Sequence, residues 1–202
     1  MKKHLLTIFF VLFAAPMWAQ VDKEADQKRY GKGQMPFNEK GEVVFSKVVQ
    51  ADGKDKNAIY QSARMLIVEM FKSAKDVVQM DDSDKGIIIA KGWSAAPGGE
   101  SDNCKIWYTL KIQCRDGRYK VDVYQIKCTR PSDYVARITI PAIDMLAEEL
   151  TDDVCIKPNG DVRTRGKGYW RRAVIDVANS VLYHIETNIF RNSSETSDVE
   201  DW

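Results

Sequence analysis

A long antiparallel β-hairpin is predicted by the residues from Tyr108 to Cys128, which read YTLKIQCRDGRYKVDVYQIKC. Two runs rich in β-branched and aromatic residues meet at Asp116 and Gly117, a pair typical of two-residue hairpin turns. With this turn, residues whose numbers sum to 233 face each other, namely Cys114 and Tyr119, Ile112 and Val121, and Leu110 and Val123. All three pairs are apolar, so one face of the hairpin is expected to pack on the core.

Further from the turn, the same register would place polar residues on the core face, because Tyr108 would face Gln125. One extra residue near Val123 and Tyr124, a β-bulge, changes the sum to 232 and restores apolar pairing. The pairs are then Tyr108 with Tyr124, Ile106 with Ile126, and Cys104 with Cys128. The pattern thus predicts a bulge and a disulfide between Cys104 and Cys128, and it leaves Cys114 and Cys155 as the second pair. The alternative, four buried thiols that act as small apolar side chains, stays open.

The N-terminus reads MKKHLLTIFFVLFAAPMWAQ, which has the organisation of a secretory signal peptide. A basic start at Lys2 and Lys3 precedes an apolar run, and cleavage is expected after Ala19. The run is shorter than the roughly 20 residues of a transmembrane helix, and no later stretch is long and apolar enough to span. We therefore expect export to the periplasm or outside the cell, where disulfides persist.

The composition of the remaining chain argues against several classes of protein. Removing residues 1–19 takes away two lysines, which leaves 28 basic and 29 acidic residues and a net charge near −1. Nucleic-acid-binding proteins normally carry a strong basic excess, so this class is not expected. A single histidine, His184, and the absence of C-x-x-C spacing argue against a metal site. Hydrolase and phosphate-loop motifs are also absent, so we predict neither an enzyme nor a bound cofactor.

The rest of the chain is read from apolar periodicity. Residues 20–42 are charged and glycine-bearing and predict a flexible N-terminal arm, and residues 193–202 predict a disordered acidic tail. A single domain is expected over 43–192, with an insertion at about 131–167. Its elements are a strand at 43–50, a helix after Asp55, strands at 76–80 and 86–93, the hairpin, a strand at 134–140, a short helix after Pro141 and a long helix at 169–190.

Three stretches together resemble a family of secreted bacterial domains of unknown function with a fold like that of the TATA-binding protein (TBP-like). They are KDKNAIYQSARMLIVEMFKSAKDVVQ, GIIIAKGW and the hairpin sequence YTLKIQCRDGRYKVDVYQI. The likeness covers about residues 42–130 and the last helix. It implies an α+β fold, with a curved antiparallel sheet in the order β-α-β-β-β-β-α and both main helices on one face. The family brings no catalytic residues, and the fold alone does not imply DNA binding.

Two surfaces are candidates for binding. On the hairpin, Trp107, Thr109 and Lys111 point away from the core face, and Trp93 is expected nearby. If both helices cover the other face, this side is an open surface for a peptide, glycan or lipid; alternatively, residues 131–167 cover it and bury Trp107. The second surface is a basic group that either is solvated or contacts an anionic surface: Arg163, Arg165, Lys167, Arg171 and Arg172.

The leading hypothesis is an exported, non-catalytic binding or interaction module of the bacterial cell envelope. Its partner would be an envelope protein, a glycan or a lipid-like ligand. The alternative is a carrier that holds a small apolar or lipid-like ligand between the sheet and the C-terminal helix. A cavity at that place favours the carrier, whereas an exposed Trp107 favours the interaction module.

Overall fold

The computed structural model describes residues 23–71, 77–97, 103–135 and 138–191. The predicted signal peptide and acidic tail lie outside these residues. The chain divides into two compact units, where the sequence predicted one domain over 43–192. The sheet unit comprises Pro36–Glu149 and Ala173–Trp202, and the small unit comprises Met1–Met35 and Leu150–Arg172. No helix in the described part of the chain is both long and apolar enough to cross a membrane.

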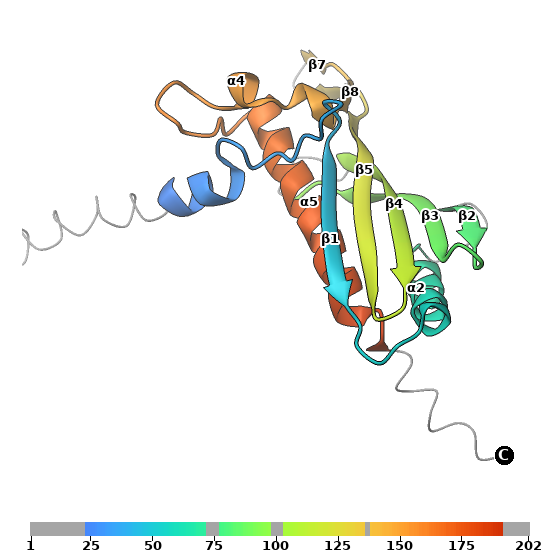
Figure 1. Cartoon of the computed structure of the whole chain (residues 1–202). Coiled ribbons are helices and arrows are strands. Elements are labelled where there is room, and N and C mark those ends of the chain that lie inside the picture. Colours follow the sequence, from blue (N-terminus) through green and yellow to red (C-terminus); the bar gives the residue numbers. More distant parts are fainter. Residues whose placement is uncertain (1–22, 72–76, 98–102, 136–137, 192–202) are drawn as a thin grey trace, which may run out of the picture. The chain divides into compact units, whose positions relative to one another are not determined.

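The sheet unit is built on an antiparallel sheet with the strand order β1-β5-β4-β3-β2, and β8 pairs with the far end of β5 (Figure 1). The Asp116-Gly117 turn joins β4 to β5 as predicted, with Gly117 at a φ of 71°. The strands are β1 (Val44–Gln50), β2 (Val78–Asp82), β3 (Ile87–Ala95), β4 (Lys105–Arg115), β5 (Arg118–Arg130) and β8 (Ile143–Leu146). The predicted α+β fold with a curved antiparallel sheet is confirmed.

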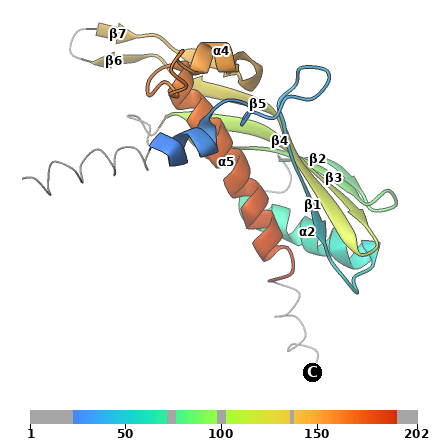
Figure 2. The same ribbon diagram turned by 60° about the vertical axis from the view of Figure 1, so that its left-hand side comes forward.

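Helices cover one face of this sheet (Figure 2). Helix α2 (Lys56–Phe71) starts where the Asp55 carboxylate accepts from the amide of Ala58 at 2.7 Å. Helix α5 (Lys167–Asn188) enters the sheet unit at Ala173. Its buried stripe is Val174, Val177, Val181 and Ile185.

Two contacts show that both helices pack on the same face. Gly92 of β3 lies under Phe71, where a β-carbon would come within 2.0 Å of the ring. Tyr119 of β5, on the same face as Gly92, has its ring centroid 6.3 Å from that of Phe190, which lies just beyond the end of α5, and Val181 of α5 lines the same hollow as Tyr108 of β4.

The register between β4 and β5 contains a bulge, but the extra residue lies on a different strand from the one that the predicted pairing requires. The three pairs next to the turn are as predicted, and the register then shifts between Thr109 and Trp107. The extra residue belongs to β5, where Gln125 has a φ of 51°. The numbers of facing residues therefore sum to 234 beyond the bulge, instead of the predicted 232. Trp107 therefore faces Lys127, and Ile106 faces Cys128.

This shift removes the basis of the predicted disulfide between Cys104 and Cys128, because Cys128 lies opposite Ile106. All four cysteines are buried free thiols, including Cys114 and Cys155, so both predicted bridges are wrong. Burial raises the pKa of the Cys128 thiol to about 12 and that of Cys114 to about 11. The structure matches the alternative in which the cysteines act as small core side chains.

The secondary structure of residues 133–149, in the predicted insertion, differs from the prediction. The strand at 134–140 is a pair of short strands, β6 (Asp133–Val135) and β7 (Ile138–Ile140), and the helix expected after Pro141 is strand β8 followed by a 3-10 turn, η1 (Ala147–Glu149). Residues of β8 pair with β5 from Lys127 to Arg130. Beyond the bulge, β5 has backbone groups that β1 does not pair. Hydrogen bonds to these groups favour a strand more than the spacing of the apolar residues favours a helix.

The small unit contradicts the expectation of a flexible arm over 20–42. Residues 23–30 are helical, and Gly31 and Met35 are buried. The other parts of this unit are α4 (Asp152–Cys155) and the start of α5 up to Arg172. Hydrogen bonds between these segments hold the N-terminal residues in place, as the next section describes.

Candidate functional site

The open face of the sheet is the side opposite α2 and α5, and it collects exposed apolar side chains. The registers place there Val48 of β1, Met80 of β2, Trp93 of β3, Trp107 of β4 and Leu146 of β8. These are five of the nine exposed large hydrophobic residues in the described part of the chain. Such a concentration on one face differs from singly scattered apolar residues and makes the open face a candidate interaction surface.

Four of these strands place one row of residues across the open face. Trp93, Trp107, Lys127 and Leu146 face one another in turn across β3, β4, β5 and β8. The two tryptophans are 47% and 41% exposed, and their ring centroids lie 6.2 Å apart. The ammonium of Lys105 lies 4.2 Å from the Trp93 ring centroid, a cation–π contact.

A hollow of about 700 Å³ lies next to this row, at the bulge. Its volume is in the range of sites that hold small molecules. The bulge shapes it, since Gln125 adopts the left-handed conformation and accepts a hydrogen bond from the Thr109 hydroxyl at 2.8 Å. The side chains that line it include Lys91, Trp107, Thr109, Gln125, Lys127 and Thr129.

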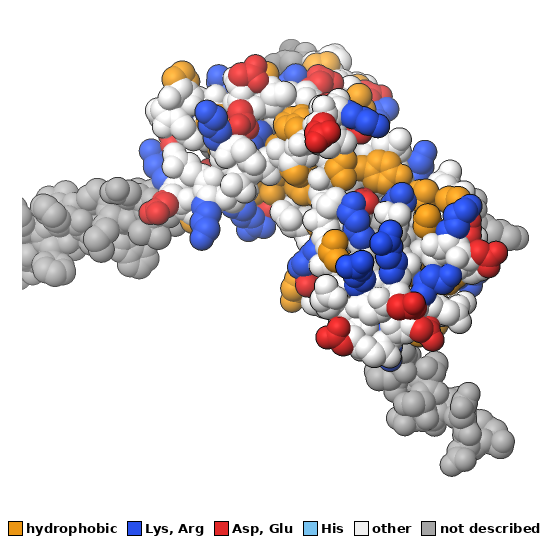
Figure 3. All heavy atoms as spheres, in the orientation of Figure 1, with side chains coloured by type: hydrophobic (Ala, Val, Ile, Leu, Met, Phe, Trp, Pro, Cys, Tyr) orange, Lys and Arg blue, Asp and Glu red, His pale blue; other side chains and the backbone are white. Residues whose placement is uncertain are grey.

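The open face carries more basic than acidic side chains. Figure 3 shows a band of hydrophobic side chains across the strands, with lysine and arginine side chains gathered beside it. Among the described residues, Lys120 pairs with Asp122 at 2.9 Å and Lys127 pairs with Asp144 at 2.8 Å. The remaining basic residues on this face are Lys91, Lys105, Lys111, Arg115 and Arg118. The electrostatic potential of the face is therefore positive, although the whole chain is nearly neutral.

The structure brings together the three hairpin residues and the neighbouring tryptophan that the sequence singled out. Trp93, Trp107, Thr109 and Lys111 all belong to the open face. Trp107 is exposed, so the described residues of the predicted insertion that belong to the sheet unit, up to Glu149, do not bury it. Thr109 is buried and forms part of the floor of the hollow. Sequence reasoning missed Lys91, Gln125, Lys127 and Thr129, because the last three reach the hollow only through the register beyond the bulge.

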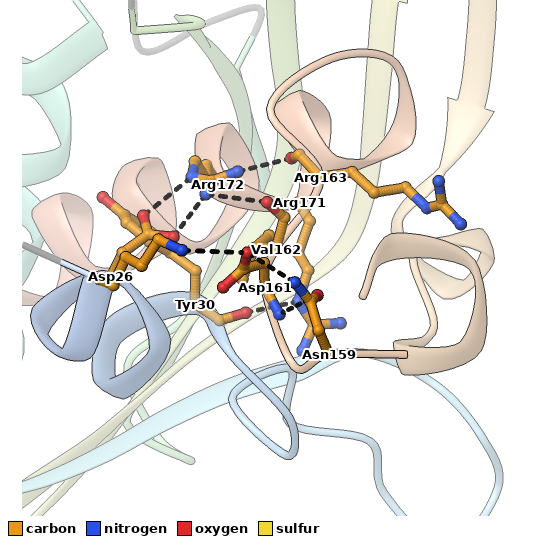
Figure 4. Close-up of polar contacts among 9 residues, drawn as sticks. Asp26, Tyr30, Asn159, Asp161, Val162, Arg163, Arg171 and Arg172 are labelled. Atoms are coloured by element: carbon orange, nitrogen blue, oxygen red, sulfur yellow. Dashed lines mark hydrogen bonds and ion pairs between the residues drawn. The ribbon is translucent and has the colours of Figure 1, made fainter. Parts of the chain in front are cut away.

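The predicted basic group at 163–172 is not one exposed patch. Figure 4 shows that Arg172 reaches Asp26, with Nη2 2.6 Å from Oδ2, and that it also donates to the carbonyl of Arg163 at 2.6 Å. Arg163 donates from Nε to the carbonyl of Val154 at 3.0 Å. Arg165 is exposed, and Lys167 begins α5.

Arg171 has no exposed surface at all. Its guanidinium donates to the carbonyls of Tyr30, Leu150 and Gly31 at 2.8, 2.8 and 2.7 Å, and to Asp152 Oδ1 at 2.7 Å. The expectation that Arg171 and Arg172 belong to a surface for anions is wrong, because the N-terminal segment supplies their partners. Their role is to hold residues 23–35 within the small unit.

A second, smaller hollow of about 310 Å³ in the sheet unit bears on the carrier hypothesis. The Ser94 and Tyr108 hydroxyls lie 3.2 Å apart at its wall, and burial raises the pKa of Tyr108. His184, which is exposed, also lines it. No group of three or more potential metal ligands occurs among the described residues. The lining is Met70, Phe71, Trp93, Ser94, Tyr108, Ser180, Val181 and His184.

Comparison with known proteins supports the fold. Residues 45–129 match the family described as "Domain of unknown function (DUF4468) with TBP-like fold". A crystal structure of a DUF4468 family protein from Bacteroides ovatus has a TM-score of 0.64 at 24% identity, over 81% of this chain and 95% of that one. A TBP-like protein from Parabacteroides distasonis has a TM-score of 0.58 at 18% identity, over 77% and 96% of the two chains. No curated protein matches. The resemblance to a family of unknown function with a TBP-like fold is thereby confirmed.

Proposed function

We propose that this protein, whose residues 45–129 carry the DUF4468 domain with TBP-like fold, is an exported, non-catalytic binding module of the bacterial cell envelope. It holds its partner on the open face of the sheet. The observation that supports this proposal is the exposed pair of Trp93 and Trp107 beside the 700 Å³ hollow. Two exposed tryptophans leave apolar surface in contact with water. A partner that covers them removes this surface from water, which stabilises the complex by about 25 cal/mol per Å².

The chemistry of the hollow favours binding over catalysis. Its lining offers ammonium, hydroxyl and amide groups around an indole ring. Among the described residues that line it, none is a carboxylate, an imidazole or a thiol, the groups that usually act as general base or nucleophile. The arrangement orients and holds a ligand rather than activating a reacting group.

Site-specific photocrosslinking in the native cells tests the proposed surface. A photoreactive derivative of phenylalanine, which keeps an aromatic ring, is placed at position 107, and a matched control carries it at position 68 on α2. Val68 is as exposed as Trp107, at 41%, but lies off the open face. We expect a discrete adduct from position 107 and none from position 68. Adducts of equal yield at both positions, or none at position 107, would contradict the proposal.

The cell fraction and the N-terminal sequence of the mature protein test its export. We expect the protein in the periplasmic or extracellular fraction with Gln20 as its first residue. A chain that stays in the cytosol with its first nineteen residues attached would refute this part of the proposal.

A carrier remains the second candidate function, and the 310 Å³ hollow between α2, β3, β4 and α5 is the observation that favours it. Native mass spectrometry of the protein from its own envelope fraction separates the two functions. A bare monomer mass is expected for the binding module, whereas a small molecule released on denaturation would support the carrier.

A further inference from the structure

We infer that the ligand of the open face is an acidic polysaccharide, with one uronate-type sugar ring stacked on Trp107 in the hollow. This inference rests on the proposed function and specifies its partner. It follows from three properties of the hollow: a fixed aromatic platform, a set of hydroxyl and amide groups, and basic side chains that continue along the strands.

Trp107 is the platform because its ring is both fixed and available. The indole N–H donates to Thr129 Oγ1 at 2.9 Å, which sets the orientation of the ring. Trp107 lines the hollow, whereas Trp93 does not, and the ammonium of Lys105 lies closer to the Trp93 ring centroid, at 4.2 Å, than to that of Trp107, at 6.0 Å. A pyranose ring presents a face of C–H groups that packs on an indole, and a fixed platform lowers the entropy lost on binding.

The hollow also offers the polar groups that a sugar needs. Thr109, Gln125 and Thr129 place hydroxyl and amide groups beside the Trp107 ring. Such groups both donate and accept hydrogen bonds, as sugar hydroxyls do. Thr109 already donates to Gln125, and Thr129 already accepts from Trp107, but a lipid chain would offer no partner to the hydrogen-bonding capacity that remains on these groups, which is costly in a covered site. No arginine lines this hollow among the described residues, although arginine is the side chain that binds phosphate bidentately.

Basic side chains give the preference for an acidic sugar. Lys91 and Lys127 flank Trp107 in the hollow, and Lys91 has no carboxylate within ion-pair distance among the described residues. Lys127 pairs with Asp144, whose side chain is largely exposed to water. A uronate carboxylate on the Trp107 ring therefore lies within a region of positive potential.

The positive charge continues along the strands, which indicates a polymer rather than a single sugar. From Trp107 to Arg115, β4 rises by eight residues, or about 27 Å. Lys111 and Arg115 lie on the open face along this line, and Arg118 and Lys120 lie beside them on β5. Arg115, Arg118 and Lys120 also line a further hollow, of about 220 Å³, near the hairpin turn. A polyuronate that lies along β4 would meet these cations at several of its carboxylates.

The test measures binding of two defined probes, a galacturonate hexamer and a hyaluronan hexamer, by tryptophan fluorescence and saturation-transfer NMR. Their carboxyl methyl esters serve as neutral controls of the same shape. We expect dissociation constants below about 1 mM for the acids and binding about tenfold weaker for the esters, since two exposed ion pairs are lost. Equal binding of acids and esters, or no binding of either, would overturn the inference.

Three variants assign the site, and each is checked for folding by circular dichroism. Trp107→Ala is expected to weaken binding of the acid hexamers at least tenfold, Trp107→Phe to restore most of it, and Lys91→Gln to weaken it about threefold. Tyr183→Ala, an exposed aromatic change on α5, should leave binding unchanged. Loss of binding in Tyr183→Ala as large as in Trp107→Ala would contradict the assignment.

Two further probes separate the other polyanions. Single-stranded oligothymidylate and anionic phospholipid vesicles are measured at the same salt concentration. Tighter binding of either probe than of the acid hexamers would overturn the inference. So would crosslinks from position 107 that lead only to a protein, which would leave the proposed function standing. The absence of any crosslink from position 107 would contradict both.

Discussion

Replacing Arg171 by methionine tests whether its guanidinium ties the N-terminal segment into the small unit. Methionine fills a similar apolar volume but cannot donate. Four hydrogen bonds are lost, three to the carbonyls of Tyr30, Gly31 and Leu150 and one to Asp152. The carboxylate of Asp152 would keep only its bond from the Gly33 amide at 2.9 Å among these contacts.

The expected cost follows from what remains buried. Removing one partner of a buried ion pair typically destabilises a protein by about 3–5 kcal/mol. The Asp152 side chain is 34% exposed, so water takes over part of its solvation and the lower end of this range applies. We expect a loss of about 3 kcal/mol in the free energy of opening of residues 23–35, or roughly a 150-fold rise in opening.

Hydrogen exchange followed by mass spectrometry measures this opening directly. The reporters are the amides of Gly31, bonded to the Gln27 carbonyl at 2.8 Å, and of Gly33. Arg165→Met is the matched control, because Arg165 is exposed. Arg171→Lys keeps the charge but lacks the planar fork that reaches four acceptors, so it should recover only part of the protection. Wild-type exchange at Gly31 and Gly33 in Arg171→Met would refute the reasoning.

The remaining predictions concern the sheet unit and the thiols. Alkylation without reductant should modify four thiols in the denatured protein and none in the folded protein; two modified thiols would reveal a bridge. Burial raises the pKa of Tyr119 and of Tyr60 from 10.0 to about 12, so the unfolded chain loses these protons first. The free energy of unfolding from urea titrations should therefore fall from about pH 9, where the thiols of Cys114 and Cys128 ionise in the unfolded chain, and fall further between pH 10 and 12, where the tyrosines add to the effect. A constant value from pH 9 to pH 12 would contradict the burial of these groups. Gly92→Ala must displace the Phe71 ring and should destabilise by about 1–3 kcal/mol in thermal denaturation; an unchanged melting temperature would contradict this contact.

The turn and the near half of the hairpin were predictable because their signals are local. Asp116 and Gly117 define the turn, and apolar alternation then pairs Leu110 with Val123. Which of the two strands carries the extra residue of the bulge was not predictable in this way. An extra residue on either strand restores apolar pairs, and Gln125 gives no sign that it adopts a left-handed conformation.

The errors beyond the hairpin also have physical causes. The apolar residues from Ile143 to Leu150 fit a helix, but the backbone of β5 from Lys127 onward is available for pairing and selects a strand. Residues 23–35 have the composition of a loose arm, yet Arg171 binds the Tyr30 carbonyl from 141 residues away in the chain. Composition within a window carries no information on such a distant partner.

The candidate site was predictable only in part for the same reason. Trp107, Thr109 and Lys111 follow from alternation on one strand, and Trp93 from the neighbouring strand. Lys127 and Thr129 depend on the register after the bulge, and their inclusion required the backbone. Nothing in the sequence alone predicts a hollow of this size at Gln125.

The bulge at Gln125 has a consequence for how strand β5 can change in length during evolution. Loss of Gln125 would remove the bulge, so that β4 and β5 would pair in one register along their whole length. Ile126 and Cys128 would stay on the core face. Loss of Val121 or Val123 would instead reverse the faces of all residues on one side of the gap. Relatives of this protein are therefore expected to vary in length at this position of the strand, and an alignment that places the gap elsewhere would exchange core and open-face residues.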